Sequence, residues 1–268
     1  MSNAKPVYLP MDPNVSLSHE DGELLSAPNK YRRLVDKLIY LTITRPDITY
    51  TVQVLSQFMQ APTTTHYTDA FRVLRYLKNY PGQGVLLSAK SAPFLNVYCD
   101  SDWGRCPDSR KSVTGYCILL GDSPVSWRTK KQSVVARSTT EAEYRAIATT
   151  CEVTWLLQLF KDLTLSSLAP ATLRCDNQAA LYIAANPVFH ERTKRIEVDC
   201  HFLREKMQAG VIFPTYVSTK VQLADFFTKI VPVAQHHLLL SKLGVHNIFP
   251  PPNLRGCEEC RNIKYAAT

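Results

Sequence analysis

Apolar residues recur at helical spacing through the early part of the chain, after a polar and proline-rich start. In 31–43, Leu34, Leu38 and Leu41 lie three or four residues apart, which is the spacing of one helix face. Pro46 follows where a new helix can begin, because proline is tolerated at the first helical position. We therefore predict three helices, at 31–43, from Pro46 onward, and at about 67–80.

The pattern changes near residue 84, where short apolar runs between turn residues replace the helical spacing. These runs predict strands at 84–89, 94–100, 114–121, 124–129, 171–177 and 211–217. Helical spacing returns between them and predicts helices at 138–163, 178–186, 195–210 and 221–230. This order of elements predicts an α/β fold, in which a mixed sheet is flanked by helices and preceded by a small helical segment.

Composition divides the chain into four predicted parts. They are an irregular N-terminal segment at 1–30, a helical segment at 31–90, the α/β domain at 91–246 and a Pro-rich flexible tail at 247–268. No apolar run is long enough to cross a membrane, and the N-terminus lacks a signal pattern. We therefore expect no membrane partner and an intracellular protein, cytoplasmic or nuclear.

Charge and cysteine content narrow the choice of partners. The 31 Lys and Arg residues outnumber the 23 Asp and Glu residues, so the net charge of +8 modestly favours a polyanionic partner. Cys257 and Cys260 form one CxxC pair, but a zinc site needs a second pair or histidines at ligand spacing, and we predict none. The P-loop, G-x-S-x-G and HExxH strings are absent, which argues against a nucleotide triphosphate site, a serine hydrolase and a zinc protease.

Four acids occupy positions that suggest a shared site. Asp100 ends a predicted strand, Glu143 lies in the first turns of a predicted helix, Asp176 ends another strand, and Asp225 lies in the last predicted helix. Neighbouring strands would bring Asp100 and Asp176 side by side, and crowded carboxylates raise one another's pKa values unless cations bind. Mg²⁺ is the natural partner of such oxygen ligands, and two ions about 4 Å apart can hydrolyse a phosphodiester.

Each acid also has a purely structural interpretation. Asp100 and its neighbour Asp102 could form a turn at the strand end. Glu143 could complete a capping box with Thr140, three residues earlier. Asp176, which precedes Asn177, could cap the next helix, and Asp225 could be a solvated helix acid.

Six motifs follow one another between 94 and 246. They are YCDSDWG, SRKSVTGYCILLG, PVSWRTKKQ, STTEAEYRAIA, CDNQAALYIAANPVFHERTKRIEVDCHFLREK and QLADFFTK. In this order they resemble the ribonuclease H region of copia-type retrotransposon Pol polyproteins of the plant kind. The resemblance implies an RNase H-like five-stranded sheet and hydrolysis of the RNA strand of RNA/DNA hybrids. It also implies that Asp100, Glu143, Asp176 and Asp225 are the four catalytic and metal-binding acids.

The segment 31–90 resembles the part of those polyproteins that joins the reverse transcriptase to ribonuclease H, and we interpret it as a remnant of the thumb or connection. The YVDD-type polymerase motif is absent, so we expect no DNA synthesis, and any reverse transcriptase partner would come from another element copy. TKR at 193–195 stands where the family usually has TKH, and Asp36 stands where glycine is usual. Neither difference touches the four acids.

The mechanism that the resemblance implies uses two Mg²⁺ ions, with Mn²⁺ as a substitute. Asp100 would bridge both ions, Asp176 and Asp225 would complete one site each, and Glu143 would hold the water-bearing side. Basic groups must meet the phosphates, and Asn177 could contact a 2′-hydroxyl. The candidates for nucleic-acid contact are Lys130, Lys131, Arg137, Asn177, Arg192, Lys194 and Arg195, with Lys229 as a further cation. A non-catalytic nucleic-acid-binding module and an inert transposon relic remain the alternatives.

Overall fold

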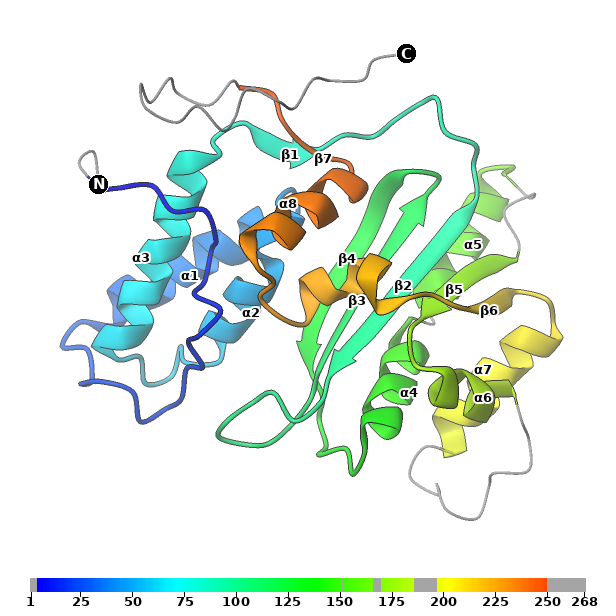
Figure 1. Cartoon of the computed structure of the whole chain (residues 1–268), viewed down its shortest axis with the longest axis horizontal. Coiled ribbons are helices and arrows are strands. Elements are labelled where there is room, and N and C mark those ends of the chain that lie inside the picture. Colours follow the sequence, from blue (N-terminus) through cyan, green and yellow to red (C-terminus); the bar gives the residue numbers. More distant parts are fainter. Residues whose placement is uncertain (1–3, 151, 166–169, 186–196, 250–268) are drawn as a thin grey trace.

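A five-stranded mixed sheet forms the centre of the protein (Figure 1). The computed structural model describes residues 4–150, 152–165, 170–185 and 197–249. The strands run in the order β4-β3-β2-β5-β6, with β2, β3 and β4 antiparallel and β5 and β6 parallel to β2. Their bounds are β2 Leu95–Asp102, β3 Val113–Leu120, β4 Ser123–Lys131, β5 Ala171–Cys175 and β6 Ile212–Tyr216. The predicted α/β class with a mixed five-stranded sheet is confirmed.

Helices cover both faces of this sheet. Side chains point alternately to the two faces along each strand, and apolar side chains on both faces need to be buried. Val97 and Cys99 of β2 pack into a core with α4 and α6, whereas Tyr98 between them packs against the opposite core. The elements on the first side are α4 Thr139–Thr149, α5 Glu152–Asp162, α6 Gln178–Ala185 and α7 Glu197–Gln208. On the other side lie η4 Thr219–Val221, η5 Leu223–Phe227 and α8 Val233–Lys242.

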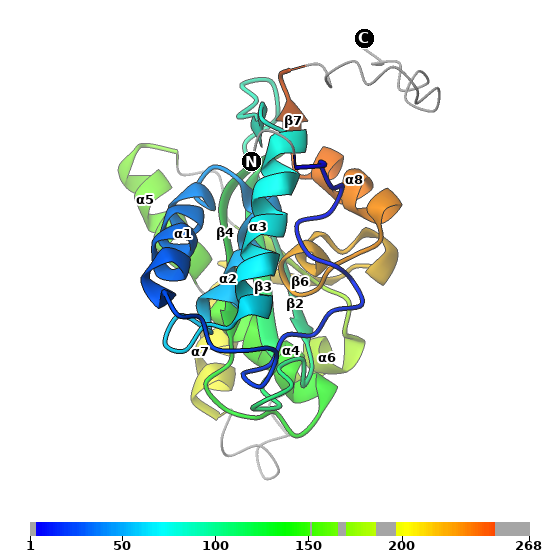
Figure 2. The ribbon, with the colours of Figure 1, turned by 90° about the vertical axis from the view of Figure 1, so that its left-hand side faces the viewer.

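A helical unit precedes the sheet and packs beside its β3–β4 end (Figure 2). Its elements are α1 Pro28–Leu41, η1 Pro46–Ile48, α2 Thr49–Ser56 and α3 Thr64–Asn79. Apolar side chains of these helices share one core with Val113 at the start of β3. The short strands β1 Gln83–Val85 and β7 Val245–Asn247 pair antiparallel and bring two distant parts of the chain together.

A buried polar network ties the helical unit to α8. Arg45 and Asp47 are each only 5% exposed, and Nη2 of Arg45 lies 2.7 Å from Oδ2 of Asp47. Gln83 donates through Nε2 to Asp47 at 2.7 Å and to the Tyr76 hydroxyl at 3.0 Å. The Tyr76 oxygen lies 3.1 Å from Nε2 of His236 on α8. Burial lowers the pKa of His236 to about 4, so the neutral ring can accept this hydrogen bond.

Several predicted boundaries were wrong. The predicted strand at 84–89 reaches only Val85, and the predicted helix at 138–163 is two helices, with Thr150 as the C-cap of α4. The predicted helix at 221–230 consists of two 3₁₀ segments, because Gln222 ends η4 in an extended conformation and caps η5 instead of continuing a helix. The elements α8 and β7 were not predicted. Among the described residues, no helix is long and apolar enough to span a bilayer.

Candidate active site

Asp100 lies on the central strand β2, next to the parallel strand β5 that leads to Asp176. It is 3% exposed, and β2 continues two residues beyond it to Asp102, so the prediction that Asp100 ends the strand was wrong. The structural alternative of a turn at this position therefore fails. Asp102 is half-buried and pairs with Arg105, whose Nε lies 3.6 Å from Oδ2.

Glu143 reaches the strand from the first half of α4. The N-cap of this helix is Ser138, whose hydroxyl accepts from the Glu141 N–H at 3.1 Å. Thr140 therefore lies inside the helix, and its proposed capping box with Glu143 does not form. Glu143 is instead 7% exposed and accepts a hydrogen bond from the backbone N–H of Ser101 at 3.3 Å.

Asp176 follows β5 directly, and its neighbour does the capping. The Asn177 side chain accepts from the Ala180 N–H at 2.9 Å, which satisfies the start of α6. Asp176 therefore keeps its carboxylate available and accepts from the Thr219 hydroxyl at 2.8 Å. The side-chain oxygen of Asn177 is thus engaged in capping, and a contact between Asn177 and a 2′-hydroxyl stays a prediction.

Asp225 is brought over Asp100 by η5, which lies directly on the sheet. Gln222 donates through Nε2 to the Cys99 carbonyl at 2.9 Å and so fixes the segment to β2. Gly115, which pairs with Asp100 in the register, allows the close approach, because a Cβ there would lie 2.7 Å from side-chain atoms of Phe227 and Thr228. Asp225 is 2% exposed as a result. The Thr228 hydroxyl donates to Asp100.

Replacing Gly115 with alanine is expected to push η5 away from the sheet. Overpacking of this kind typically costs about 1–3 kcal/mol of folding free energy. Because η5 carries Asp225, Mn²⁺ binding should weaken as well, and calorimetry together with denaturant unfolding would measure both effects. Gly84 is a matched control, since an added Cβ there meets nothing within 4 Å. Equal behaviour of the two alanine variants would contradict the proposed close packing.

The electrostatics of the four acids reflect their crowding. Burial, together with the nearby carboxylates of Asp100 and Asp176, raises the pKa of Glu143 to about 10. Burial and the charge of Asp100 raise the pKa of Asp225 to about 7, against the opposing effect of Lys229. The four carboxyl groups thus interact electrostatically, although they come from four separate segments.

These pKa shifts predict a pH dependence for the metal-free protein. A carboxyl group whose folded-state pKa exceeds its unfolded value stabilises the fold at low pH, and this contribution is lost as pH rises through the folded pKa. The free energy of unfolding should therefore fall as the pH rises from about 4 to about 7, because Asp225 becomes ionised in the folded protein. The loss should be a few kcal/mol at most, since one pKa unit corresponds to about 1.4 kcal/mol. Urea unfolding in EDTA at several pH values would measure this.

The variant Asp225→Asn should make the profile less steep over that range, with the contribution of Glu143 remaining, whereas Asp36→Asn, at an exposed helix position, should leave it unchanged. Saturating Mg²⁺ should reverse the trend, because the ion binds the ionised carboxylates. A metal-free profile that is the same for Asp225→Asn and for the unchanged protein would contradict the assignment.

Lys229 lies among the acids rather than on an open phosphate-facing surface. Its Nζ is 2.9 Å from Oδ1 of Asp225 and 3.8 Å from Oδ2 of Asp100. It is four residues after Asp225, so both groups leave the same short segment. The sequence contains this spacing within QLADFFTK, but its meaning depends on the tertiary contact with β2.

The donor set fits a hard divalent ion. Oxygen atoms of four carboxylates are the ligands that Mg²⁺ and Mn²⁺ prefer, and their mutual repulsion is what a bound cation would relieve. Ligand atoms of Glu143, Asp176 and Cys175 all lie within 4.8 Å of one another. Cys175 is fully buried, and its sulfur lies 3.9 Å from Glu143 Oε2, a neighbour that the sequence did not indicate.

The structure describes only some of the residues that we predict to contact nucleic acid. Lys130 and Arg137 are exposed, and Lys131 is half-buried with Nζ 3.7 Å from the Cys106 sulfur. A hollow of about 240 Å³ is lined by Lys130 and Lys131 of β4 and by Arg145 of α4. Arg192, Lys194, Arg195 and the pair Cys257 and Cys260 lie outside the described residues.

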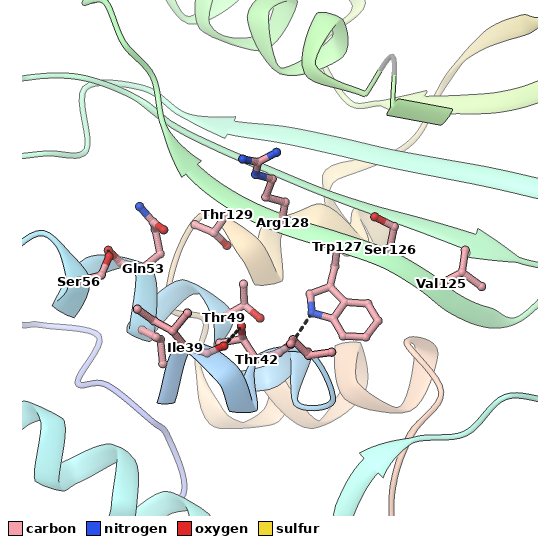
Figure 3. A pocket seen from close by; sticks show the side chains of 12 residues that line it. Ile39, Thr42, Thr49, Gln53, Ser56, Val125, Ser126, Trp127, Arg128 and Thr129 are labelled. Atoms are coloured by element: carbon pink, nitrogen blue, oxygen red, sulfur yellow. Dashed lines mark hydrogen bonds between the residues drawn. The ribbon is translucent and has the colours of Figure 1, made fainter. Parts of the chain in front are cut away.

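A second hollow lies between the helical unit and β4, and none of the four acids lines it (Figure 3). Its volume is about 430 Å³. Trp127 points from β4 toward the helices, and its indole N–H donates to the Thr42 carbonyl at 2.9 Å. Apart from Arg128, uncharged side chains form its wall, so this hollow has none of the carboxylates that the acid cluster provides.

Two supporting side chains were missed by the sequence analysis. Gln132, at the end of β4, donates to Ser101, Thr114 and the Ala142 carbonyl at 3.0–3.3 Å, and so joins the strands to α4. Gln222 holds η5 as described above. Isolated glutamines carry no pattern that distinguishes them from surface residues, and only their burial marks their role.

Similar solved structures are RNase H proteins. The N-terminal RNase H domain of a Mycobacterium tuberculosis protein, fused to maltose-binding protein, is 12% identical with a TM-score of 0.37, and covers 56% of this chain and 98% of that chain. LC11-RNase H1 in complex with an RNA/DNA hybrid is 16% identical with a TM-score of 0.37, and covers 50% of this chain and 93% of that chain. No family model matches the chain.

Similar curated proteins are plant retrotransposon polyproteins. The retrovirus-related Pol polyprotein from transposon RE1 of Arabidopsis thaliana is 43% identical over 251 residues, which is 93% of this chain and 17% of that polyprotein. The polyprotein from transposon RE2 of the same plant is 42% identical over 96% of this chain and 18% of its own length. An uncharacterized mitochondrial protein of Arabidopsis thaliana is 50% identical over 82 residues, which is 31% of this chain and 74% of that protein. The chain spans less than a fifth of the polyproteins, and its homologues include copia-type retrotransposon Pol polyproteins from plants.

Proposed function

We propose that the chain is a ribonuclease H that hydrolyses the RNA strand of RNA/DNA hybrids with the help of Mg²⁺. The observation that carries the proposal is the convergence of Asp100, Glu143, Asp176 and Asp225 from β2, α4, the end of β5 and η5. Three buried carboxylates and one half-buried carboxylate in one place favour a bound cation, and such a set of acids suits a metal-dependent phosphodiesterase. Similarity to retrotransposon Pol polyproteins supports the same activity.

The four acids are the residues that would hold the metal. Divalent ions, when bound there, would position the scissile phosphate, activate a water and stabilise the leaving oxygen. Asp100 is central, because its charge affects both Glu143 and Asp225. Thr228 and Ser101 orient the carboxylates of Asp100 and Glu143 through hydrogen bonds, as supporting residues in metal sites do.

The chain would bind the hybrid mainly through contacts to its phosphates. Lys130, Lys131 and Arg145 surround a hollow beside α4 and offer positive charge without base-specific groups. RNA-strand selectivity requires contacts to 2′-hydroxyls in the wide minor groove. Binding should therefore weaken steeply with salt and depend little on sequence.

The domain assignment follows from this function. We propose that 91–246 is the catalytic domain and that 31–90 is the remnant of the reverse transcriptase thumb or connection. The buried contact between Tyr76 and His236, 3.1 Å apart, links the two parts and supports the view that they fold as one unit. DNA synthesis is not proposed for this chain, because it lacks the YVDD-type motif.

The test is cleavage of a labelled RNA/DNA hybrid by the full chain at low salt, with Mg²⁺, with Mn²⁺ and with EDTA. We expect cutting of the RNA strand alone, with either metal and not with EDTA. Double-stranded DNA and single-stranded RNA of the same sequence serve as substrate controls. A folded protein that binds Mn²⁺ and the hybrid but never cuts it would overturn the proposal and leave the non-catalytic binding module.

A further inference from the structure

The ammonium group of Lys229 lies between two of the proposed metal ligands. Nζ is 2.9 Å from Asp225 Oδ1 and 3.8 Å from Asp100 Oδ2. The backbone N–H of Lys229 also donates to the Asp225 carbonyl at 3.2 Å, which holds the start of the side chain close to this acid. The lysine follows η5 by two residues and is held to it by this hydrogen bond.

The metal-free site requires such a cation. Asp100 and Asp225 are only 3% and 2% exposed, and buried carboxylates without a partner are strongly unfavourable. Among the described residues, no Lys, Arg or His other than Lys229 forms an ion pair with either acid. Thr228 supplies a hydrogen bond to Asp100 but no charge.

A divalent ion would need the same oxygen atoms that Lys229 contacts. Oδ2 of Asp100 and Oδ1 of Asp225 are the atoms that this ammonium approaches. Two cations at these atoms would repel each other, so the ammonium and the ion compete. The competition follows from the positive charge of the ammonium and its distances to the two carboxylates.

We propose that Lys229 is a built-in counter-ion, which holds Asp100 and Asp225 together in the metal-free protein and gives them up when a divalent ion binds. The released ammonium then contacts a phosphate of the bound nucleic acid. This inference rests on the proposed function of the site, because it concerns the same metal and substrate. Lys229 is thus a residue that couples metal binding to substrate binding.

The side chain can make both contacts. The Lys229 side chain is 36% exposed, in contrast to the acids beside it, so part of it is already open to solvent. A lysine has a flexible four-carbon stem with a compact charge, which allows the head group to move several ångströms without a backbone change. Nucleic acid that enters the site would bring its phosphates to this open side.

The first test is Mn²⁺ binding by isothermal calorimetry to the full chain and to the variant Lys229→Met. Removal of the competing ammonium should tighten Mn²⁺ binding about five- to tenfold, a change that corresponds to about 1–1.4 kcal/mol. The metal-free variant should also melt at a lower temperature than the unchanged protein, whereas saturating Mn²⁺ should remove most of this difference. Lys90→Met, an exposed loop position with the same change of net charge, is the control and should change neither quantity.

The second test is hybrid binding by fluorescence anisotropy with Ca²⁺ in place of Mg²⁺, with a gel to verify that the RNA is intact. Lys229→Met should bind the hybrid more weakly than Lys90→Met, and the slope of log affinity against log salt should fall by about one for the lost phosphate contact. The variant Lys229→Gln, which keeps a polar head group without charge, should behave as Lys229→Met does. The Lys229→Gln variant replaces Lys229→Met in both tests if the methionine variant fails to fold.

The outcomes separate the inference from the proposed function. If the unchanged protein binds no Mn²⁺, the proposed function itself fails. If it binds Mn²⁺ and the Lys229 variants bind it equally or more weakly, the counter-ion role is overturned. If Mn²⁺ binding tightens but hybrid affinity and salt slope match those of Lys90→Met, the phosphate contact is overturned.

Discussion

Hybrid cleavage is expected to fall by at least about 10²–10³-fold when Asp100 is replaced by asparagine, since loss of a single group that stabilises transition-state charge has effects of this size. Asp100 contributes a carboxylate next to both Asp225 and Glu143, so its neutralisation should impair every metal position at once. The substitution keeps the shape of the side chain and removes one negative charge from a crowded site. Stability without metal should therefore change little, or rise.

The matched control is Asp102→Asn. Asp102 lies on the same strand and the same face, but pairs with Arg105 instead of the other acids. Its replacement should leave cleavage within a few-fold of the unchanged protein. Initial rates on a labelled hybrid, together with Mn²⁺ binding and melting temperature for both variants, would measure the contrast. Similar losses in the two variants would show that bulk charge, and not a ligand position, explains the effect.

Replacing Asp47 with alanine is expected to destabilise the protein by about 3–5 kcal/mol, which is the usual cost of leaving one partner of a buried ion pair alone. Arg45 would remain 5% exposed without its carboxylate, and Gln83 would lose the acceptor of its 2.7 Å hydrogen bond. For a protein of this size the loss corresponds to a drop of roughly 10 °C in melting temperature. Denaturant unfolding of the metal-free protein would measure it.

Asp36→Ala is the control for this prediction, because Asp36 is an exposed acid on α1 of the same helical unit. Its effect should stay within about 0.5 kcal/mol. The double change of Arg45→Met and Asp47→Leu should recover much of the loss, since removal of both charges leaves no unpaired group. If Asp47→Ala unfolds at the same denaturant concentration as Asp36→Ala, the network contributes nothing to stability.

Sequence patterns predicted the central sheet well because each strand is a short apolar run bounded by turn residues. β2 to β6 all lie within or close to their predicted ranges. The elements that were missed or misassigned depend on partners far away in the chain. β7 is three residues long and exists through its pairing with β1, and η5 remains a 3₁₀ segment because Gln222 and Gly115 hold it against the sheet.

The candidate site shows the same division. The four acids could be proposed from motif order, because each follows or precedes a recognisable element. Their alternatives could be resolved only in three dimensions, where Ser138 and Asn177 perform the capping that the sequence allowed Thr140 and Asp176 to perform. Lys229 belonged to a general pool of cations in the sequence, and its closeness to Asp100 depends on the packing of η5 across β2 and β3.

The pairing of β1 with β7 has a consequence for how the protein acquires its structure during synthesis. Gln83 pairs with Asn247, and His236 meets Tyr76, so part of the helical unit obtains its final neighbours only after nearly the whole described chain has been made. Contacts this distant in sequence slow folding, because a large loop must close before they form. While the ribosome translates the intervening strands, the surface that α8 and β7 will cover stays open to water and to other chains. Late translation, rather than the early helices, should therefore determine when the nascent protein becomes resistant to protease.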